Sequence, residues 1–199
     1  MKILFLSNNA VSNSLCEWLK LNNADTLIYN EKLSSKLFDN FNPDLIISYN
    51  YRYIISKEVV NLFRNKIINL HISLLPYNRG AHPNVWSFIE NTPKGVTIHL
   101  IDEGLDTGDI IFQKEVQFDE NKETFFTSYE KLNTEIQNLF KENWDKIKRG
   151  VFIPKKQDNR KATMHKKNEL DDLLKYFGDE FWHTKISDLK HIINEKGLI

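Results

Sequence analysis

One apolar stretch of the chain reads Ile68-Asn69-Leu70-His71-Ile72-Ser73-Leu74-Leu75-Pro76 and carries an amide and an imidazole near its start. Alternate residues of an extended strand point to the same face, so Asn69 and His71 are expected to reach one cleft. A second stretch, Gly104-Leu105-Asp106-Thr107-Gly108-Asp109-Ile110, adds a carboxylate after another strand-like run. A carboxylate brought to an imidazole from a neighbouring strand end orients it and favours its protonated form. The two stretches therefore predict a proton-transfer site.

Short runs rich in β-branched or aromatic residues alternate with amphipathic segments along the chain. The pattern predicts strands at residues 3–6, 45–48, 67–70, 96–101 and 109–112, and helices at residues 14–21, 56–63, 82–91, 124–148, 168–177 and 186–194. This alternation predicts an α/β fold with a mainly parallel, twisted sheet flanked by helices. Ligands of such sheets bind beyond the carboxyl ends of the strands, where His71 and Asp106 are expected.

A length of 199 residues fits one domain with a short C-terminal appendage. We place the main domain at residues 1–150, because Gly150 ends the long helix pattern, and a C-terminal extension of loop and short helices at residues 151–199. The extension would complete an acceptor site or form a dimer contact. Its apolar side chains suit either a homodimer or packing on their own domain; they are Phe177, Phe181, Trp182 and Ile186.

Charge and composition limit the partners of the protein. Lys+Arg 27 balances Asp+Glu 27, so no net field draws the chain to nucleic acid or to an anionic membrane. The single cysteine, Cys16, and the absence of a signal peptide or membrane-span pattern predict a soluble, cytoplasmic protein. The remaining histidines lack metal-ligand spacing, which predicts no metal site; they are His82, His99, His165, His183 and His191.

The two stretches quoted first resemble the folate-dependent formyltransferase superfamily. Its signature is Asn-x-His, then Ser-Leu-Leu-Pro, then an Asp in a Gly-Leu-Asp-Thr-Gly-like loop, and every one of these positions is occupied here. The resemblance implies a Rossmann-like formyltransferase fold with residues 1–150 as the catalytic domain. It also implies N10-formyltetrahydrofolate as co-substrate, no metal, and Asn69, His71 and Asp106 as the catalytic residues.

Within this superfamily the sequence is most similar to the nucleotide-sugar N-formyltransferases. Residues 51–55 resemble the loop that these enzymes wrap around the pterin, and residues 77–86, Tyr-Asn-Arg-Gly-Ala-His-Pro-Asn-Val-Trp, have a form characteristic of them. Residues 162–165 look like a variant of their Gly-Thr-Tyr-His segment, with departures at Ala162 and Met164.

The resemblance implies two sets of binding residues. The folate-binding set is Tyr53, Ile54, Ile55, Leu100, Asp102 and Leu105. The set for the sugar nucleotide is Tyr77, Asn78, Arg79, Trp86, Met164 and His165. Arg79 would bind phosphate through its bidentate fork. Core packing stays the alternative for Ile54 and Ile55, and an exposed turn position stays the alternative for Arg79.

The implied function is formyl transfer to the amine of a nucleotide-linked amino-deoxy sugar, most similar to the dTDP-4-amino-4,6-dideoxy-glucose type, in O-antigen and lipopolysaccharide biosynthesis. Three alternatives stay open: a phosphoribosylglycinamide formyltransferase, a formyltetrahydrofolate hydrolase, and a non-catalytic nucleotide-sugar-binding protein. The loop at residues 7–13 has no glycine, so its backbone cannot approach a phosphate as closely as the glycinamide ribonucleotide enzymes require. The nucleotide base, the C3 or C4 position of the amine and the oligomeric state stay open at this point.

Overall fold

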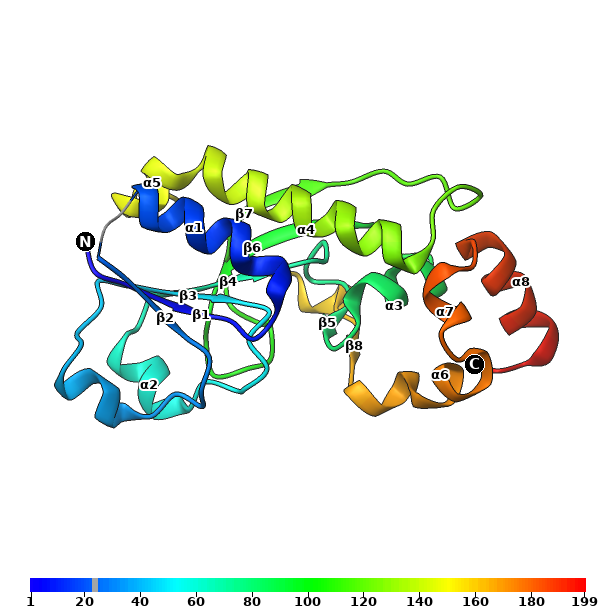
Figure 1. The fold of residues 1–199 in the computed structure, drawn as a ribbon, viewed down its shortest axis with the longest axis horizontal. Helices are drawn as coiled ribbons and strands as arrows, with labels where there is room; N and C mark the ends of the chain where they lie inside the picture. The colour runs from blue at the N-terminus through cyan, green and yellow to red at the C-terminus, as the bar shows by residue number, and fades with distance from the viewer. Residues whose placement is uncertain (23–24) are drawn as a thin grey trace. The chain divides into compact units, whose positions relative to one another are not determined.

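The structure, a computed structural model, describes residues 1–22 and 25–199 (Figure 1). The chain divides into two compact units. Unit 1 comprises Met1–His71, Thr97–Phe112 and Ile136–Gln157, and unit 2 comprises Ile72–Val96, Gln113–Glu135 and Asp158–Ile199. Each unit contains residues from both sides of residue 150. The two units therefore follow other boundaries than the predicted segments 1–150 and 151–199, and the roles proposed for these segments stay predictions.

The main sheet has the strand order β2-β1-β3-β4-β6-β7. Its strands are β1 Ile3–Leu6, β2 Thr26–Tyr29, β3 Leu45–Tyr49, β4 Ile67–His71, β6 Gly95–Leu100 and β7 Ile110–Glu115. β1 pairs in parallel with β2 and β3, and β3 pairs in parallel with β4, whereas β4 pairs antiparallel with β6. The mainly parallel sheet confirms the predicted α/β class.

The α-helices of the described chain are α1 Asn13–Asn22, α2 Lys57–Leu62, α3 Pro83–Ile89, α4 Phe125–Glu142, α5 Trp144–Lys148, α6 Asp171–Phe177, α7 Glu180–His183 and α8 Ile186–Lys196. In unit 1, Figure 1 shows α1 and the C-terminal part of α4 on one side of the sheet and α2 on the other. In the described part of the chain, none of the helices combines the length and the apolar character that a membrane span needs.

The core of unit 1 follows from strands that are apolar along their whole length. Every residue of β1 and of β3 is buried, as expected for parallel strands covered on both faces. Ser56 caps α2 by accepting a hydrogen bond from the Val59 backbone N–H, a role in which serine is strongly preferred. Cys16 is buried on α1, and burial raises the pKa of its thiol, in agreement with a packing role.

Unit 2 has its own apolar cluster, drawn from several short helices. Its buried members are Val85, Trp86, Phe88, Phe125, Leu170, Leu173, Phe181, Ile186, Leu189 and Ile193. Phe177 and Trp182 pack against this cluster and are partly buried. The apolar side chains of the C-terminal segment thus pack within their own unit, and the homodimer stays a prediction.

Phe181 offers a test of this second core. Its side chain is 0% exposed, so Phe181→Ala should lower the free energy of unfolding by about 3–5 kcal/mol through lost burial and a residual cavity. Phe126→Ala is the matched control, because Phe126 is 45% exposed and should change stability by less than about 1 kcal/mol. Urea denaturation of both variants measures the difference, and equal losses would contradict the assignment of Phe181 to the core.

Several local features differ from the sequence prediction. The predicted helix at residues 124–148 is two helices, because the Asn143 backbone, with φ −106° and ψ 9°, leaves the helical conformation between α4 and α5. The helix predicted at 168–177 begins at Asp171, after a 3-10 turn. Strand β2 was not predicted, since this short strand is only partly buried at the sheet edge and lacks the apolar run of β1.

Candidate active site

β4 positions the first two predicted catalytic side chains at the carboxyl end of the parallel strands. The Asn69 amide Nδ2 donates to Asp106 Oδ1 over 3.3 Å, and His71 Nδ1 lies 3.8 Å from Asp106 Oδ2. The His71 side chain is 9% exposed and that of Asp106 13% exposed, so the charge of the carboxylate is poorly screened by water. The structure therefore brings Asn69, His71 and Asp106 together, with each carboxylate oxygen facing a different partner.

His99 completes this cluster and was missed by the sequence prediction. It pairs directly with Asn69 across the β4–β6 ladder. His99 Nδ1 lies 2.7 Å from the Leu100 carbonyl, which can only accept, so this nitrogen carries hydrogen. His99 Nε2 lies 3.2 Å from Asn69 Nδ2 and 3.5 Å from Asp106 Oδ1. One partly buried carboxylate thus faces two imidazoles and an amide.

The loop between β6 and β7 presents Asp106 in a constrained backbone conformation. Asp106 has φ 52°, in the left-handed region that non-glycine residues seldom adopt. Gly108 lies so close to β6 that an added Cβ would come within 1.8 Å of the Leu100 carbonyl oxygen. Only glycine fits at this close approach, which explains its place in the motif.

Asp102, predicted to contact folate, forms part of the same loop. Its Oδ1 accepts from the Gly104 backbone N–H at 3.0 Å and from the Thr107 hydroxyl at 2.5 Å. These bonds close the turn at residues 102–107, which contains Asp106. Asp102 therefore shapes the loop, and its contact with folate stays a prediction.

Two neighbouring loops of unit 1 expose apolar side chains. Ile54 is 85% exposed and Leu105 is 47% exposed, so neither is a core residue. An ion pair of 2.8 Å between Lys57 and Glu103 links the segments that carry them. Its hydrogen bond lowers the pKa of the Glu103 carboxyl. Exposed apolar side chains on linked loops are typical of a ligand site.

The remaining predicted folate contacts have different surroundings. Tyr53 is half-buried, and its hydroxyl accepts a hydrogen bond from the Arg52 guanidinium. Ile55 packs against the apolar cluster of unit 1, and Leu100 is buried at the end of β6. Core packing therefore describes Ile55 and Leu100, whereas Ile54 and Leu105 are available to a ligand.

Predicted substrate residues gather in unit 2 around a small parallel sheet, β5 Arg79–Gly80 with β8 Met164–His165. Asn78 is fully buried; its Nδ2 donates to Glu90 Oε2 at 3.0 Å and its Oδ1 accepts from the Thr92 hydroxyl at 2.7 Å. The Arg79 guanidinium donates to Asn159 Oδ1 at 2.8 Å and is 8% exposed, so the exposed-turn alternative is wrong.

His165 lies between two carboxylates and against an indole. Its Nε2 is 2.9 Å from a Glu90 carboxylate oxygen, and its Nδ1 is 2.8 Å from a Glu169 carboxylate oxygen. The hydrogen bond to His165 lowers the pKa of the Glu169 carboxyl. The ring stacks on Trp86 at 4.0 Å with an interplanar angle of 8°.

Most of the predicted substrate residues therefore have partners inside unit 2. Asn78, Arg79, Trp86 and His165 hold β5, β8 and α3 together. Met164 is 51% exposed and Tyr77 is half-buried. A direct substrate contact stays a prediction for the whole set.

Residues 12–143 match the protein family described as Formyl transferase. The chain belongs to the formyl transferase family. The match contains Asn69, His71, His99 and Asp106, so the whole cluster lies inside the family region. It ends before Met164 and His165.

Relatives of two kinds within this family resemble the chain. A methionyl-tRNA formyltransferase of Thermodesulfovibrio yellowstonii is 41% identical over 125 residues, which are 61% of this chain and 40% of that protein. The chain spans less than half the length of the methionyl-tRNA formyltransferases that it matches. Sequence relatives alone therefore do not assign the acceptor.

Solved structures of family members cover far more of the chain. The formyltransferase PseJ from Anoxybacillus kamchatkensis, crystallised in complex with UDP-4,6-dideoxy-4-formamido-L-AltNAc and tetrahydrofolate, is 43% identical, has a TM-score of 0.86 and covers 95% of this chain and 97% of that chain. A 4-N formyltransferase from Francisella tularensis is 27% identical, with a TM-score of 0.71, and covers 86% of this chain and 78% of that chain. The resemblance inferred from the two motifs is confirmed, as is the formyltransferase fold.

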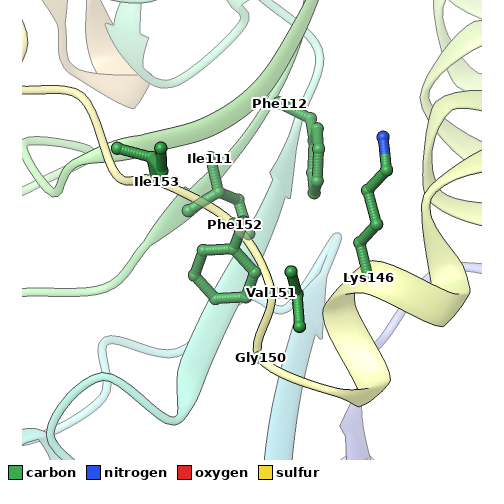
Figure 2. A pocket seen from close by; sticks show the side chains of 7 residues that line it. All are labelled: Ile111, Phe112, Lys146, Gly150, Val151, Phe152 and Ile153. Carbon is green, nitrogen blue, oxygen red and sulfur yellow. The ribbon is translucent and has the colours of Figure 1, made fainter.

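A separate surface pocket of unit 1 contains none of these site residues. Figure 2 shows its lining, which is Ile111, Phe112, Lys146, Gly150, Val151, Phe152 and Ile153. The Lys146 ammonium lies 5.8 Å from the centroid of the Phe112 ring. Across residues 1–22 and 25–199, His, Cys, Asp and Glu do not form any group of three or more that could hold a metal ion.

Proposed function

We propose that this protein transfers a formyl group from N10-formyltetrahydrofolate to the amine of a nucleotide-linked amino-deoxy sugar. The observation that carries the chemistry is the convergence of Asn69 and His71 on the partly buried carboxylate of Asp106. The acceptor class is supported by the similarity to PseJ, which extends over 95% of this chain. Together these favour the nucleotide-sugar N-formyltransferases within the family.

Formyl transfer to an amine is an acyl transfer, in which negative charge develops on the formyl oxygen as nitrogen attacks carbon. Each preset hydrogen-bond donor at such an oxygen contributes about 3–4 kcal/mol to lowering the barrier. The Asn69 amide carries two N–H groups, of which one donates to Asp106 and the other is the first donor to this oxygen. An imidazole whose Nδ1 faces Asp106 directs Nε2–H to the opposite side of its ring, and this makes His71 the second donor.

Asp106 has two tasks in this mechanism. Its negative charge beside His71 stabilises a protonated imidazole, which is the stronger donor. It also accepts a proton from the attacking nitrogen, directly or through water, as the new C–N bond forms. The old bond from the formyl carbon to the folate nitrogen breaks, and that nitrogen takes up a proton. This route needs no covalent intermediate on the protein.

The loops of unit 1 fit the co-substrate, which supplies the formyl group when bound. A pterin is flat, and two exposed side chains offer it apolar surface. Leu105 precedes Asp106 in the chain, and Ile54 lies on the segment that the Lys57–Glu103 ion pair links to this loop. We assign folate contact to these two residues first. Tyr53, Ile55, Leu100 and Asp102 would support the same site from their loops.

For the acceptor we propose a UDP-linked sugar with its amine at C4. This revises the earlier preference for a dTDP sugar, because PseJ, whose structure covers 95% of this chain, was crystallised with UDP-4,6-dideoxy-4-formamido-L-AltNAc. Met164 and Tyr77 are the proposed contacts with the sugar nucleotide, since both have accessible surface. A role in O-antigen or other surface polysaccharide biosynthesis is part of this proposal.

Methionyl-tRNA is the second candidate acceptor, favoured by the 41% identity to the Thermodesulfovibrio enzyme. The charge balance of the chain weighs against it, because Lys+Arg 27 equals Asp+Glu 27 and tRNA binding relies on a basic surface. The sugar nucleotide is therefore the preferred acceptor.

The test is an acceptor panel with N10-formyltetrahydrofolate, in which released tetrahydrofolate is measured. The panel holds UDP- and dTDP-linked 4-amino and 3-amino sugars, methionyl-tRNA, glycinamide ribonucleotide and a reaction without acceptor. We expect release that depends on a UDP-linked 4-amino sugar, with the formamido product identified by mass spectrometry.

Other outcomes identify the alternatives. Release without acceptor would indicate a formyltetrahydrofolate hydrolase, and release only with methionyl-tRNA or glycinamide ribonucleotide would assign those acceptors. Nucleotide-sugar binding without any release would indicate a non-catalytic binding protein. Each of these results would overturn the proposed function.

A further inference from the structure

Gln157 contacts the loop that carries Asp106, although 51 residues separate the two positions in the chain. Its side-chain Nε2 donates to the Asp106 backbone carbonyl at 2.9 Å and to the Gly108 backbone carbonyl at 2.7 Å. A primary amide carries two N–H groups, so one nitrogen can serve both carbonyls. The Gln157 side chain therefore bridges the backbone on both sides of Thr107.

This bridge acts where the loop needs support. Asp106 has φ 52°, and a non-glycine residue in this conformation persists only when its surroundings hold it. Gly108, two residues after Asp106, lies against the Leu100 carbonyl, so the loop has little room to shift toward β6. Hydrogen bonds to the carbonyls of Asp106 and Gly108 restrain the peptide planes that direct the Asp106 side chain toward His71 and Asn69.

The segment before Gln157 is itself anchored. Lys155 and Ile110 form an isolated antiparallel bridge, with N–H to O distances of 2.8 Å in both directions. Gln157 lies two residues beyond Lys155, and Ile110 lies two residues beyond Gly108. The bridge thus holds the chain at residue 157 alongside the loop that contains Asp106.

We propose that Gln157 is a positioning residue for Asp106, acting through the backbone carbonyls of residues 106 and 108. This inference rests on the proposed function, in which Asp106 assists the attacking nitrogen. Misplacement of a reacting group by about 1 Å can lower a rate by about 100-fold without preventing substrate binding. A positioning role therefore predicts a loss in kcat at nearly constant KM.

Three variants test this role. Gln157→Ala removes the bridge, and Gln157→Glu keeps the side-chain length but removes both N–H donors. Gln117→Ala is the matched control, because Gln117 is exposed. In the described structure its side chain donates a hydrogen bond to the nearby Glu115 carboxylate and does not contact the Asp106 loop. We expect kcat to fall by about 10- to 100-fold in both Gln157 variants, with KM for folate and acceptor within about threefold of the wild type.

Amide hydrogen exchange gives a second readout that needs neither folate nor acceptor. The peptide covering residues 102–110 should exchange faster in Gln157→Ala and Gln157→Glu than in the wild type and Gln117→Ala. Far-UV circular dichroism checks that all variants are folded.

The outcomes separate this inference from the proposed function. A wild type that formylates none of the amino sugars contradicts the function, while the exchange measurement still tests the bridge. Unchanged exchange in both Gln157 variants overturns the inference. A kcat within twofold of the wild-type value in both variants also overturns it. A change confined to KM overturns it as well.

Discussion

His71→Ala should lower kcat for formyl transfer by about 1,000-fold while changing KM little. The substitution removes a donor to the developing oxyanion, a loss of about 100- to 1,000-fold in comparable sites. It also removes the imidazole that faces Asp106 Oδ2 at 3.8 Å. Steady-state rates of tetrahydrofolate release, with the acceptor identified in the panel, measure the effect.

The control for this prediction is His191→Ala. The His191 side chain is 72% exposed and pairs with Glu195 on its own helix, so its removal should leave kcat unchanged. Thermal unfolding of both variants distinguishes a catalytic loss from a folding defect. A folded His71→Ala protein with a rate within tenfold of the wild type would exclude His71 from the chemistry.

Asp106→Asn should also lower kcat by about 1,000-fold or more. The amide keeps the size of the carboxylate but cannot accept a proton or stabilise a protonated imidazole. The substitution also removes the negative charge that faces two imidazoles in the wild type. The Asp106 carboxylate oxygens lie 3.8 Å from His71 Nδ1 and 3.5 Å from His99 Nε2. In the analogous buried Asp–His pair of serine proteases, the same substitution lowers kcat about 10,000-fold.

Asp119→Asn is the matched control for this substitution. Asp119 is exposed and forms a surface ion pair of 2.9 Å with Lys122, which contributes little to stability. Its kcat should equal that of the wild type. Retention of more than a tenth of the rate in Asp106→Asn would show that the attacking nitrogen loses its proton without the carboxylate.

Local patterns in the sequence predicted the parts of the site that depend on short-range geometry. The two-residue spacing of Asn69 and His71 in an apolar run placed both on one strand face, since strand side chains alternate. The Gly-Leu-Asp-Thr-Gly-like stretch marked the loop that carries Asp106, because turns depend on a few neighbouring residues. The family signature linked these positions into one predicted site.

Residues distant in the chain joined the site only through strand order and register. His99 was one of several scattered histidines in the sequence, and it became a member of the cluster because antiparallel β6 pairs it with Asn69. Gln157 had no signal in the sequence, since its role depends on two backbone carbonyls about 50 residues earlier. Neither relation is encoded in local periodicity.

Burial and internal pairing likewise required the tertiary structure. Trp86 and His165 resembled substrate contacts, yet they stack on each other, and His165 bonds to Glu90 and Glu169. Apolar alternation and spacing thus specified the elements, their buried faces and the Asn69–His71 pair, because these follow from the geometry of a single strand or helix. The partners of each polar side chain were decided by which distant segments the fold brought within hydrogen-bond distance, because a hydrogen bond acts only over about 3 Å.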